Sequence, residues 1–239
     1  DFDCDAATKT YTLKDGVPYA GEKGNVKPGM WKFKKIDGSK DNKITEADKT
    51  VIGNAYPKIY GGINNTFTYK DFDLSIFLTY SIGNDVFNAT KLTNTKTALQ
   101  NKNVLAVADS KHRWVLVNKA GDLITDPQEM ADINKGKTVA AIYDNEAGDT
   151  YIHSWAVEDG SFLKLSNITL GYTFPKKMIR KVGLSKLRLY ATGSNLLTWT
   201  KYSGFDPEVS TMGNGLTPGV DFGAYPRSRA FVFGINLAF

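Results

Sequence analysis

Apolar and polar residues alternate with a period of two over much of this chain. Between positions 59 and 69 one alternating set is mostly apolar, and between positions 72 and 82 almost every second residue is apolar. The same alternation returns in the segments 161–174, 185–199 and 229–239. A period of two is typical of β-strands that expose one face to an apolar environment. The sequence therefore predicts five strands and an all-β fold.

Two local features set the register of these strands. Lys70-Asp71 separates the first two strands, and a two-residue loop places its flanking residues, Tyr69 and Phe72, on one face. Their apolar sets then match across the turn, which indicates a single hairpin. In the strand 161–174 the apolar phase changes near Ser166-Asn167, and this predicts a β-bulge.

The connections between the strands alternate strictly in length. Residues 70–71 and 175–184 form short links, whereas residues 83–160 and 200–228 form long ones. Transmembrane β-barrels of the outer-membrane type alternate short turns with long external loops in this way. Five strands cannot close a barrel, so we expect either that partner strands are missing or that the chain is incomplete. A soluble β-sandwich also has alternating faces and stays open as the alternative.

Composition narrows the class of protein. The 239 residues are 41% hydrophobic and 12% aromatic with a mean hydropathy of -0.32, which excludes a disordered chain. No apolar run approaches the ~18 residues of a transmembrane helix, so a helical membrane protein is excluded. The net charge of +5 is a modest excess that neither requires nucleic-acid binding nor excludes it. The single cysteine, Cys4, excludes an internal disulfide and a cysteine-rich metal site.

An acidic loop at residues 37–48 resembles the calcium loop of an EF-hand. Carboxylate, hydroxyl and carbonyl oxygens at the expected spacing make the candidate calcium ligands Asp37, Ser39, Asp41, the Lys43 carbonyl and Asp48. Asn42 replaces the usual glycine and Asp48 replaces the usual bidentate glutamate. Thr45 to Asp48 equally suits a capped turn without a metal. The loop therefore predicts a structural calcium site, with the capped turn as the alternative.

Catalytic chemistry has no candidate residues in this chain. His112 and His153 lie far apart without a metal-ligand spacing, and no phosphate-binding glycine loop is present. The basic residues at 176–181 lack interleaved aromatic residues, which argues against nucleic-acid binding. We therefore expect a protein that is not an enzyme.

The long connections carry aromatic and acidic residues that suit sugar recognition, because rings stack on sugar faces while carboxylates accept hydrogen bonds from hydroxyls. The candidate substrate-binding residues are Trp114, Trp155, Tyr202 and Asp206. Packing within the loops explains these side chains equally well, so both interpretations stay open.

Several motifs together resemble the C-terminal region of the SusC/RagA family of TonB-dependent outer-membrane transporters. The resemblance covers about residues 28 to 239, in order along the chain. It rests on the acidic loop with Lys43-Ile44-Thr45 and Asp48, Val51-Ile52-Gly53-Asn54, Phe72-Asp73-Leu74-Ser75-Ile76-Phe77, Gly83-Asn84-Asp85-Val86-Phe87-Asn88, Val157-Glu158-Asp159-Gly160-Ser161-Phe162-Leu163, Asn167-Ile168-Thr169-Leu170-Gly171-Tyr172, Gly193-Ser194-Asn195-Leu196-Leu197-Thr198-Trp199, Tyr202-Ser203-Gly204-Phe205-Asp206-Pro207-Glu208 and Tyr225-Pro226-Arg227-Ser228-Arg229.

This resemblance implies the C-terminal portion of a large antiparallel transmembrane β-barrel, with 22 strands around an N-terminal plug in the family. It implies a location in the outer membrane of a Gram-negative bacterium, against outer-membrane lipid. The implied partners are a SusD-like surface lipoprotein, TonB, and the remaining barrel and plug. The implied cargo is an oligosaccharide or a peptide, and the terminal Phe239 resembles the signal for barrel assembly.

We therefore expect two regions: residues 1–56, an extracellular-side loop region with the calcium loop, and residues 57–239, barrel strands with the long extracellular loops 83–160 and 200–228. The alternative from another class is a soluble, calcium-stabilised carbohydrate-binding β-sandwich or adhesin.

Overall fold

The computed structural model describes residues 1–95, 103–141, 151–211 and 217–239. These residues form two compact units, each discontinuous in the sequence: a first unit of residues 1–52 and 90–156, and a second unit of residues 53–89 and 157–239. Residues 90–156 of the long connection 83–160 belong to the first unit, and residues 83–89 and 157–160 belong to the second.

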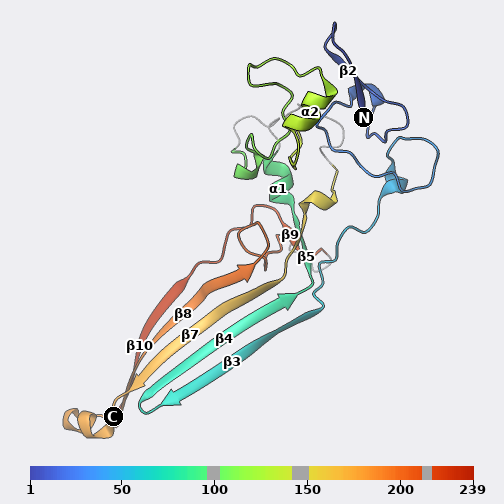
Figure 1. Cartoon of the computed structure of the whole chain (residues 1–239). Coiled ribbons are helices and arrows are strands. Elements are labelled where there is room, and N and C mark those ends of the chain that lie inside the picture. The colour runs from blue at the N-terminus through green and yellow to red at the C-terminus, as the bar shows by residue number, and fades with distance from the viewer. Residues whose placement is uncertain (96–102, 142–150, 212–216) are drawn as a thin grey trace. The chain divides into compact units, whose positions relative to one another are not determined.

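A five-stranded antiparallel sheet dominates the second unit (Figure 1). Its strands lie in the order β10-β8-β7-β4-β3. Their bounds are Ile59–Tyr69 for β3, Phe72–Ile82 for β4, Phe162–Thr173 for β7, Lys186–Thr200 for β8 and Ala230–Ala238 for β10. Each of the five strands predicted from the alternating pattern is confirmed to within one or two residues.

The predicted hairpin and bulge are both confirmed. Tyr69 pairs with Phe72 across the β3–β4 turn, in which Lys70 has the left-handed φ of 53°. In β7 the pairing skips Ser166, while Asn195 and Leu196 are skipped on the facing strand β8. The bulge keeps the apolar residues on both sides of it on the same face of the sheet.

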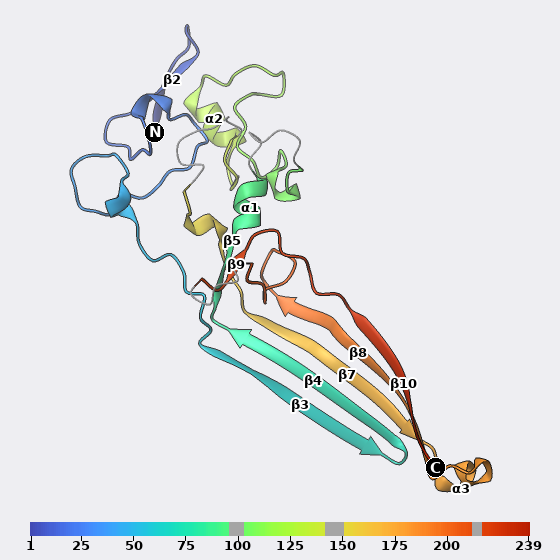
Figure 2. The same cartoon turned by 180° about the vertical axis from the view of Figure 1, so that it is seen from behind.

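The second unit also contains short elements. A three-stranded sheet in the order β6-β5-β9 combines Asp85–Asn88 (β5), Val157–Asp159 (β6) and Val220–Asp221 (β9). The short link between β7 and β8 contains α3, Lys176–Ile179, followed by a 3-10 turn at Arg180–Val182. The β3–β4 turn, α3 and the C-terminus lie at one end of the long sheet (Figure 2).

The first unit consists mainly of loops. It contains the hairpin of β1 (Phe2–Asp5) and β2 (Thr10–Leu13), the helix α2 (Pro127–Ile133), and 3-10 turns at Lys23–Asn25, Glu46–Asp48, Ala106–Ala108 and Ser154–Ala156. Helix α1, Ala89–Asn94, belongs to this unit except for its first residue, Ala89, which is assigned to the second unit. Asp126 caps α2, since its side chain accepts a hydrogen bond from the Glu129 N–H at 2.7 Å.

Buried apolar residues lie mainly in the loop-rich first unit, among them Leu13, Leu92, Ile124, Met130 and Val139. Among the described residues, the five long strands contribute no apolar side chain to this core. No helix of the described residues has the length and hydropathy to cross a membrane.

Candidate functional site

The long sheet has two faces of opposite character. Side chains of one alternating set are mostly large and apolar, and none of these apolar side chains is buried. Those in the middle of β4, such as Ile76, are partly exposed, whereas Phe233 of the edge strand β10 is 78% exposed. This apolar face comprises Ile59, Ile63, Phe67, Tyr69, Phe72, Leu74, Ile76, Leu78, Tyr80, Ile82, Leu163, Leu165, Ile168, Leu170, Tyr172, Leu187, Leu189, Leu197, Trp199, Phe231, Phe233, Ile235 and Leu237. An apolar surface of this extent marks a binding or membrane-contact face.

The opposite, polar face carries hydrogen bonds and an ion pair between strands. Arg188 of β8 donates through Nε to Asp73 of β4 at 3.0 Å. Thr169 and Thr192 hydroxyl groups lie 2.9 Å apart, and Ser194 donates to Asn167 at 2.7 Å. A polar face of this kind suits contact with water or with polar groups rather than with lipid.

A buried cluster of charged side chains joins the loop after β8, within residues 200–228, to the polar face of the sheet by ion pairs. Lys164 of β7 is only 4% exposed, and its ammonium lies 2.5 Å from the Glu208 carboxylate and 3.8 Å from that of Asp206. Arg227 lies within 3.8 Å of Asp206 and 3.6 Å of Glu208. The two loop carboxylates are therefore held by one cation from the sheet and one from the loop itself.

A second anchor lies at Tyr202, at the start of the same loop. Its buried hydroxyl donates to Asp221 of β9 at 2.6 Å. Burial raises the pKa of Tyr202 well above its ordinary value, and the neighbouring Asp221 carboxylate raises it further. Ser203 also donates through its N–H to Glu158 of β6 at 2.8 Å. The loop is thus joined to the small sheet as well as to β7.

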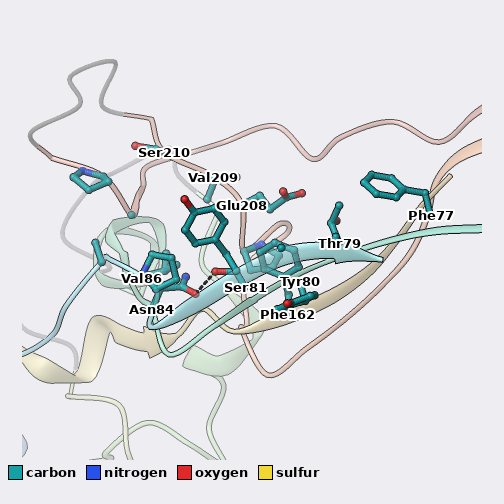
Figure 3. Close-up of a pocket in the computed structure, with 18 residues that line it drawn as sticks. Phe77, Thr79, Tyr80, Ser81, Asn84, Val86, Phe162, Glu208, Val209 and Ser210 are labelled. Carbon is teal, nitrogen blue, oxygen red and sulfur yellow. Dashed lines mark hydrogen bonds between the residues drawn. The ribbon is translucent and has the colours of Figure 1, made fainter. Parts of the chain in front are cut away.

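Between this loop and the sheet lies an open pocket of about 590 Å³ (Figure 3). Thr79 and Ser81 of β4 and Phe162 of β7 line the sheet side, and Glu208 and Val209 line the loop side. The other lining residues are Ala55, Pro57, Tyr60, Gly61, Gly62, Phe77, Tyr80, Asn84, Val86, Pro207, Ser210, Pro218 and Gly219. The pocket thus presents aromatic rings, hydroxyl groups and a carboxylate, a mixture that suits a polar cargo with apolar parts.

In the first unit, the acidic loop closes around a lysine. Lys35 Nζ lies 2.9 Å from Asp37, 3.1 Å from Asp48 and 3.3 Å from Asp41. Burial by itself would lower the pKa of Lys35, but its hydrogen bonds to these carboxylates outweigh burial and raise it. Burial would likewise raise the pKa of Asp48, but hydrogen bonds from the N–H groups of Ile36 and Thr45 and from Lys35 hold it well below its usual range.

The capped turn expected as the alternative is present, with Thr45 as N-cap and a reciprocal capping box to Asp48. Within the described residues, no group of three or more His, Cys, Asp or Glu side chains is arranged to hold a metal ion. Ser39 lies in the loop, where its N–H donates to Asp37 at 2.9 Å. Calcium binding stays a prediction.

Comparison with known proteins identifies the relatives of this chain. No family model matches it. The chain is 31% identical over 221 residues to TonB-dependent receptor P3 of Formosa agariphila, a match that covers 90% of this chain and 20% of that protein. It is 28% identical over 206 residues to TonB-dependent receptor SusC of Bacteroides thetaiotaomicron, covering 85% of this chain and 17% of that protein. The chain belongs to the SusC/RagA family of TonB-dependent receptors. It spans about a fifth of the length of these curated relatives.

Solved structures agree with this assignment at the level of the fold. The receptor segment superposes on the structure of the RagAB peptide transporter with a TM-score of 0.61 and 24% identity, over 82% of this chain and 19% of that one. For the RagAB peptide importer in the closed-closed state, the TM-score is 0.63 and the identity is 23%. That superposition covers 83% of this chain and 19% of the importer chain. The fold of this segment is therefore that of a portion of the large antiparallel barrel of these transporters.

The four predicted substrate-binding residues of the receptor segment fall into separate environments. Tyr202 and Asp206 are each 6% exposed and take part in the loop anchors of the second unit. Trp114 and Trp155 are half-buried in the first unit. Each unit thus contains two of the four residues.

Sequence reasoning missed an aromatic cluster around Trp155. The Trp155 ring lies 5.1 Å from that of Trp31, and the His153 ring lies 4.5 Å from Trp31 and 5.7 Å from Phe33. The Lys91 ammonium lies 4.3 Å above the Trp155 ring. Trp31 and Phe33 lie more than a hundred positions before His153 and Trp155, and Lys91 lies between the two pairs, so no local pattern links them. The alternations of ring side chains at Trp31 and Phe33 and at His153 and Trp155 are the local signals that the sequence offers.

The last residue of the receptor segment, Phe239, is 92% exposed. Its carbonyl oxygen accepts a hydrogen bond from the Ser185 hydroxyl at 3.2 Å. The aromatic ring is therefore accessible at the end of β10, and its role as an assembly signal stays a prediction.

Proposed function

We propose that this receptor segment forms part of the wall of an outer-membrane nutrient importer. Its apolar face contacts lipid, and its polar face lines the transport path. The observation that carries this proposal is the exposed apolar face, which holds large side chains on all five long strands opposite an ion-paired polar face. A soluble β-sandwich would bury such side chains in a core.

The partners follow from the family. The whole receptor, of which this chain is a part, would use TonB for energy, a SusD-like surface lipoprotein at its mouth, and the remaining barrel and plug. Its cargo would be an oligosaccharide or a peptide. The names of the relatives support this proposal, since they are TonB-dependent receptors and the RagAB proteins are described as peptide transporters.

Cargo contact is proposed for the loop residues and the pocket of the polar face. Trp114 and Trp155 keep part of their rings accessible, whereas Tyr202 and Asp206 would act by holding the loop that forms the pocket wall. Through this loop, Glu208 brings a carboxylate to the pocket.

The orientation of the sheet is tested by placing one arginine on each face of β3 in the whole receptor. Ile63, which is 49% exposed, lies on the apolar face, and Thr66, three residues further along the same strand, lies on the polar face. Ile63→Arg should lower the free energy of unfolding in phospholipid by about 2–4 kcal/mol, because a charge then faces hydrocarbon. Thr66→Arg is the matched control and should change it little.

Urea unfolding in lipid vesicles, followed by tryptophan fluorescence, measures both variants. Equal effects of the two substitutions would contradict the proposed orientation. A receptor that folds as a monomer in plain buffer without detergent would instead favour the soluble alternative.

Partner and cargo are tested separately. Purification of the receptor from detergent-solubilised outer membranes should recover a surface lipoprotein in stoichiometric amount. Uptake by cells, compared between labelled oligosaccharides and labelled peptides with and without the receptor, should identify the cargo class. If cells that lack the receptor take up both cargo classes as fast as cells that contain it, import of either class is ruled out as its function.

A further inference from the structure

The acidic loop of the first unit already contains a cation. The three N–H bonds of the Lys35 ammonium go to Asp37 Oδ2 at 2.9 Å, the Lys43 carbonyl oxygen at 2.7 Å and Asp48 Oδ2 at 3.1 Å. Asp41 adds an ion pair at 3.3 Å. An ammonium has three hydrogen-bond donors, and here all three are used.

These oxygens are the same ones that the sequence pattern assigns to calcium. Four of the five predicted ligand residues, Asp37, Asp41, Lys43 and Asp48, contact Lys35 through the predicted oxygen-bearing group. The distances of 2.7 to 3.3 Å from Lys35 Nζ to these oxygens are those of hydrogen bonds and ion pairs. The lysine thus occupies the centre of the loop.

Asp48, the residue at the position of the bidentate calcium ligand, has no oxygen left for a metal. Its Oδ1 accepts from the N–H groups of Ile36 at 2.8 Å and Asp37 at 3.1 Å. Its Oδ2 accepts from the Thr45 N–H at 2.9 Å and from Lys35. A carboxylate has about four acceptor sites, so four donors saturate it.

Burial supports the same conclusion. The side chains of Lys35 and Asp48 are 12% and 3% exposed, and that of Asp37 is 14% exposed. A long lysine side chain is rarely buried to this extent unless its charge is paired. Calcium would have to displace this ammonium from carboxylates that already hold it.

We propose that the Lys35 ammonium is the resident cation of the loop at residues 37–48 and takes the place that calcium holds in an EF-hand. The loop is then ordered without a metal, and calcium competes with Lys35 for the same oxygens. Removal of Lys35 leaves the carboxylates of Asp37, Asp41 and Asp48 facing one another, and the loop opens.

Hydrogen exchange of residues 33–48, measured by mass spectrometry on the whole receptor in detergent, tests this proposal. In EGTA, the wild-type loop should exchange slowly, and Lys35→Met should raise its rate at least about tenfold, because the Asp48 hydrogen-bond network loses its cation. Lys40→Met removes the charge of an exposed lysine from the same loop and serves as the matched control. It should exchange like the wild type.

Calcium chloride at about 1 mM, within the affinity range of extracellular calcium modules, supplies the second readout. It should leave the wild-type exchange rate and the calorimetric baseline unchanged. Wild-type exchange that is fast in EGTA and slow in calcium would overturn the proposal, since the loop would then need the metal. Lys35→Met that exchanges as slowly as the wild type in EGTA would overturn it equally.

Discussion

Asp73 on β4 and Arg188 on β8 form an ion pair across the strand that lies between them. β7 separates their strands, and its Gly171 is the register partner of Asp73. A Cβ atom at Gly171 would lie 2.5 Å from Asp73 Oδ1. The ion pair therefore occupies the space that any larger side chain at position 171 would fill.

Gly171→Ala should lower the free energy of unfolding of the receptor by about 1–3 kcal/mol, because the added methyl group displaces the Asp73 carboxylate or the Arg188 guanidinium. Urea unfolding in lipid measures the change. Gly193→Ala on β8 is the control, since its nearest neighbours are the flexible end atoms of Leu196 at 3.0 Å. Equal losses of unfolding free energy in the two variants would contradict a specific clash between a side chain at position 171 and the ion pair of Asp73 and Arg188.

Tyr202→Phe should weaken the loop anchor by about 1–3 kcal/mol, since the buried Asp221 carboxylate loses the Tyr202 hydroxyl as donor. The pKa of Tyr202 is raised above its ordinary 10.0, so its contribution to stability is complete below pH 10 and is lost as the pH rises above that value. Thermal unfolding between neutral and strongly alkaline pH should show a steeper decline in the wild type than in Tyr202→Phe. Identical slopes would contradict the assigned role.

Lys164→Met should release the loop after β8 from the sheet. The substitution removes the buried cation and leaves the carboxylates of Asp206 and Glu208 together, which costs about 3 kcal/mol in buried pairs of this kind. Hydrogen exchange of residues 201–211 should accelerate. Lys177→Met, at an exposed lysine of α3, should leave it unchanged. Adding Glu208→Gln to Lys164→Met should restore part of the protection against exchange. If it does not, the pair of Lys164 and Glu208 is not what holds the loop against the sheet.

Lys70→Gly should stabilise the β3–β4 hairpin. Lys70 has a φ of 53°, which costs a residue with a Cβ about 1 kcal/mol relative to glycine. The gain should exceed the loss of the exposed contact between the Lys70 ammonium and the Tyr69 ring at 5.3 Å. Asp71→Gly is the control in the same turn. A urea midpoint for Lys70→Gly that is lower than that of the wild type would contradict backbone strain at Lys70.

The alternation of apolar and polar residues was sufficient to predict the strands of the long sheet. β3 and β4 end where the sequence pattern ends, and the change of phase near Ser166 located the bulge. Strands are predictable here because successive side chains of a strand point to opposite faces of the sheet. A sheet with one apolar and one polar environment therefore produces an alternating order of residues.

The candidate site was less predictable, because its contacts join residues that are distant in the sequence. Lys164 and Glu208 lie 44 positions apart, and Asp73 and Arg188 lie 115 apart. Trp31 and Trp155 lie 124 positions apart, although their rings are neighbours in the structure. Lys35 precedes the acidic loop by two residues, and no spacing rule indicated that its side chain would enter the loop.

The amino-acid sequence was enough to establish the strand content, the alternation of short and long connections and the family resemblance, since each depends on local order or on motifs. The partition into two units, the polar-face ion pairs and the occupant of the acidic loop depend on which distant segments meet. Charge and hydrogen-bond partners are chosen in three dimensions, where the burial of a few groups decides whether an acidic loop binds a metal ion or a lysine of its own chain.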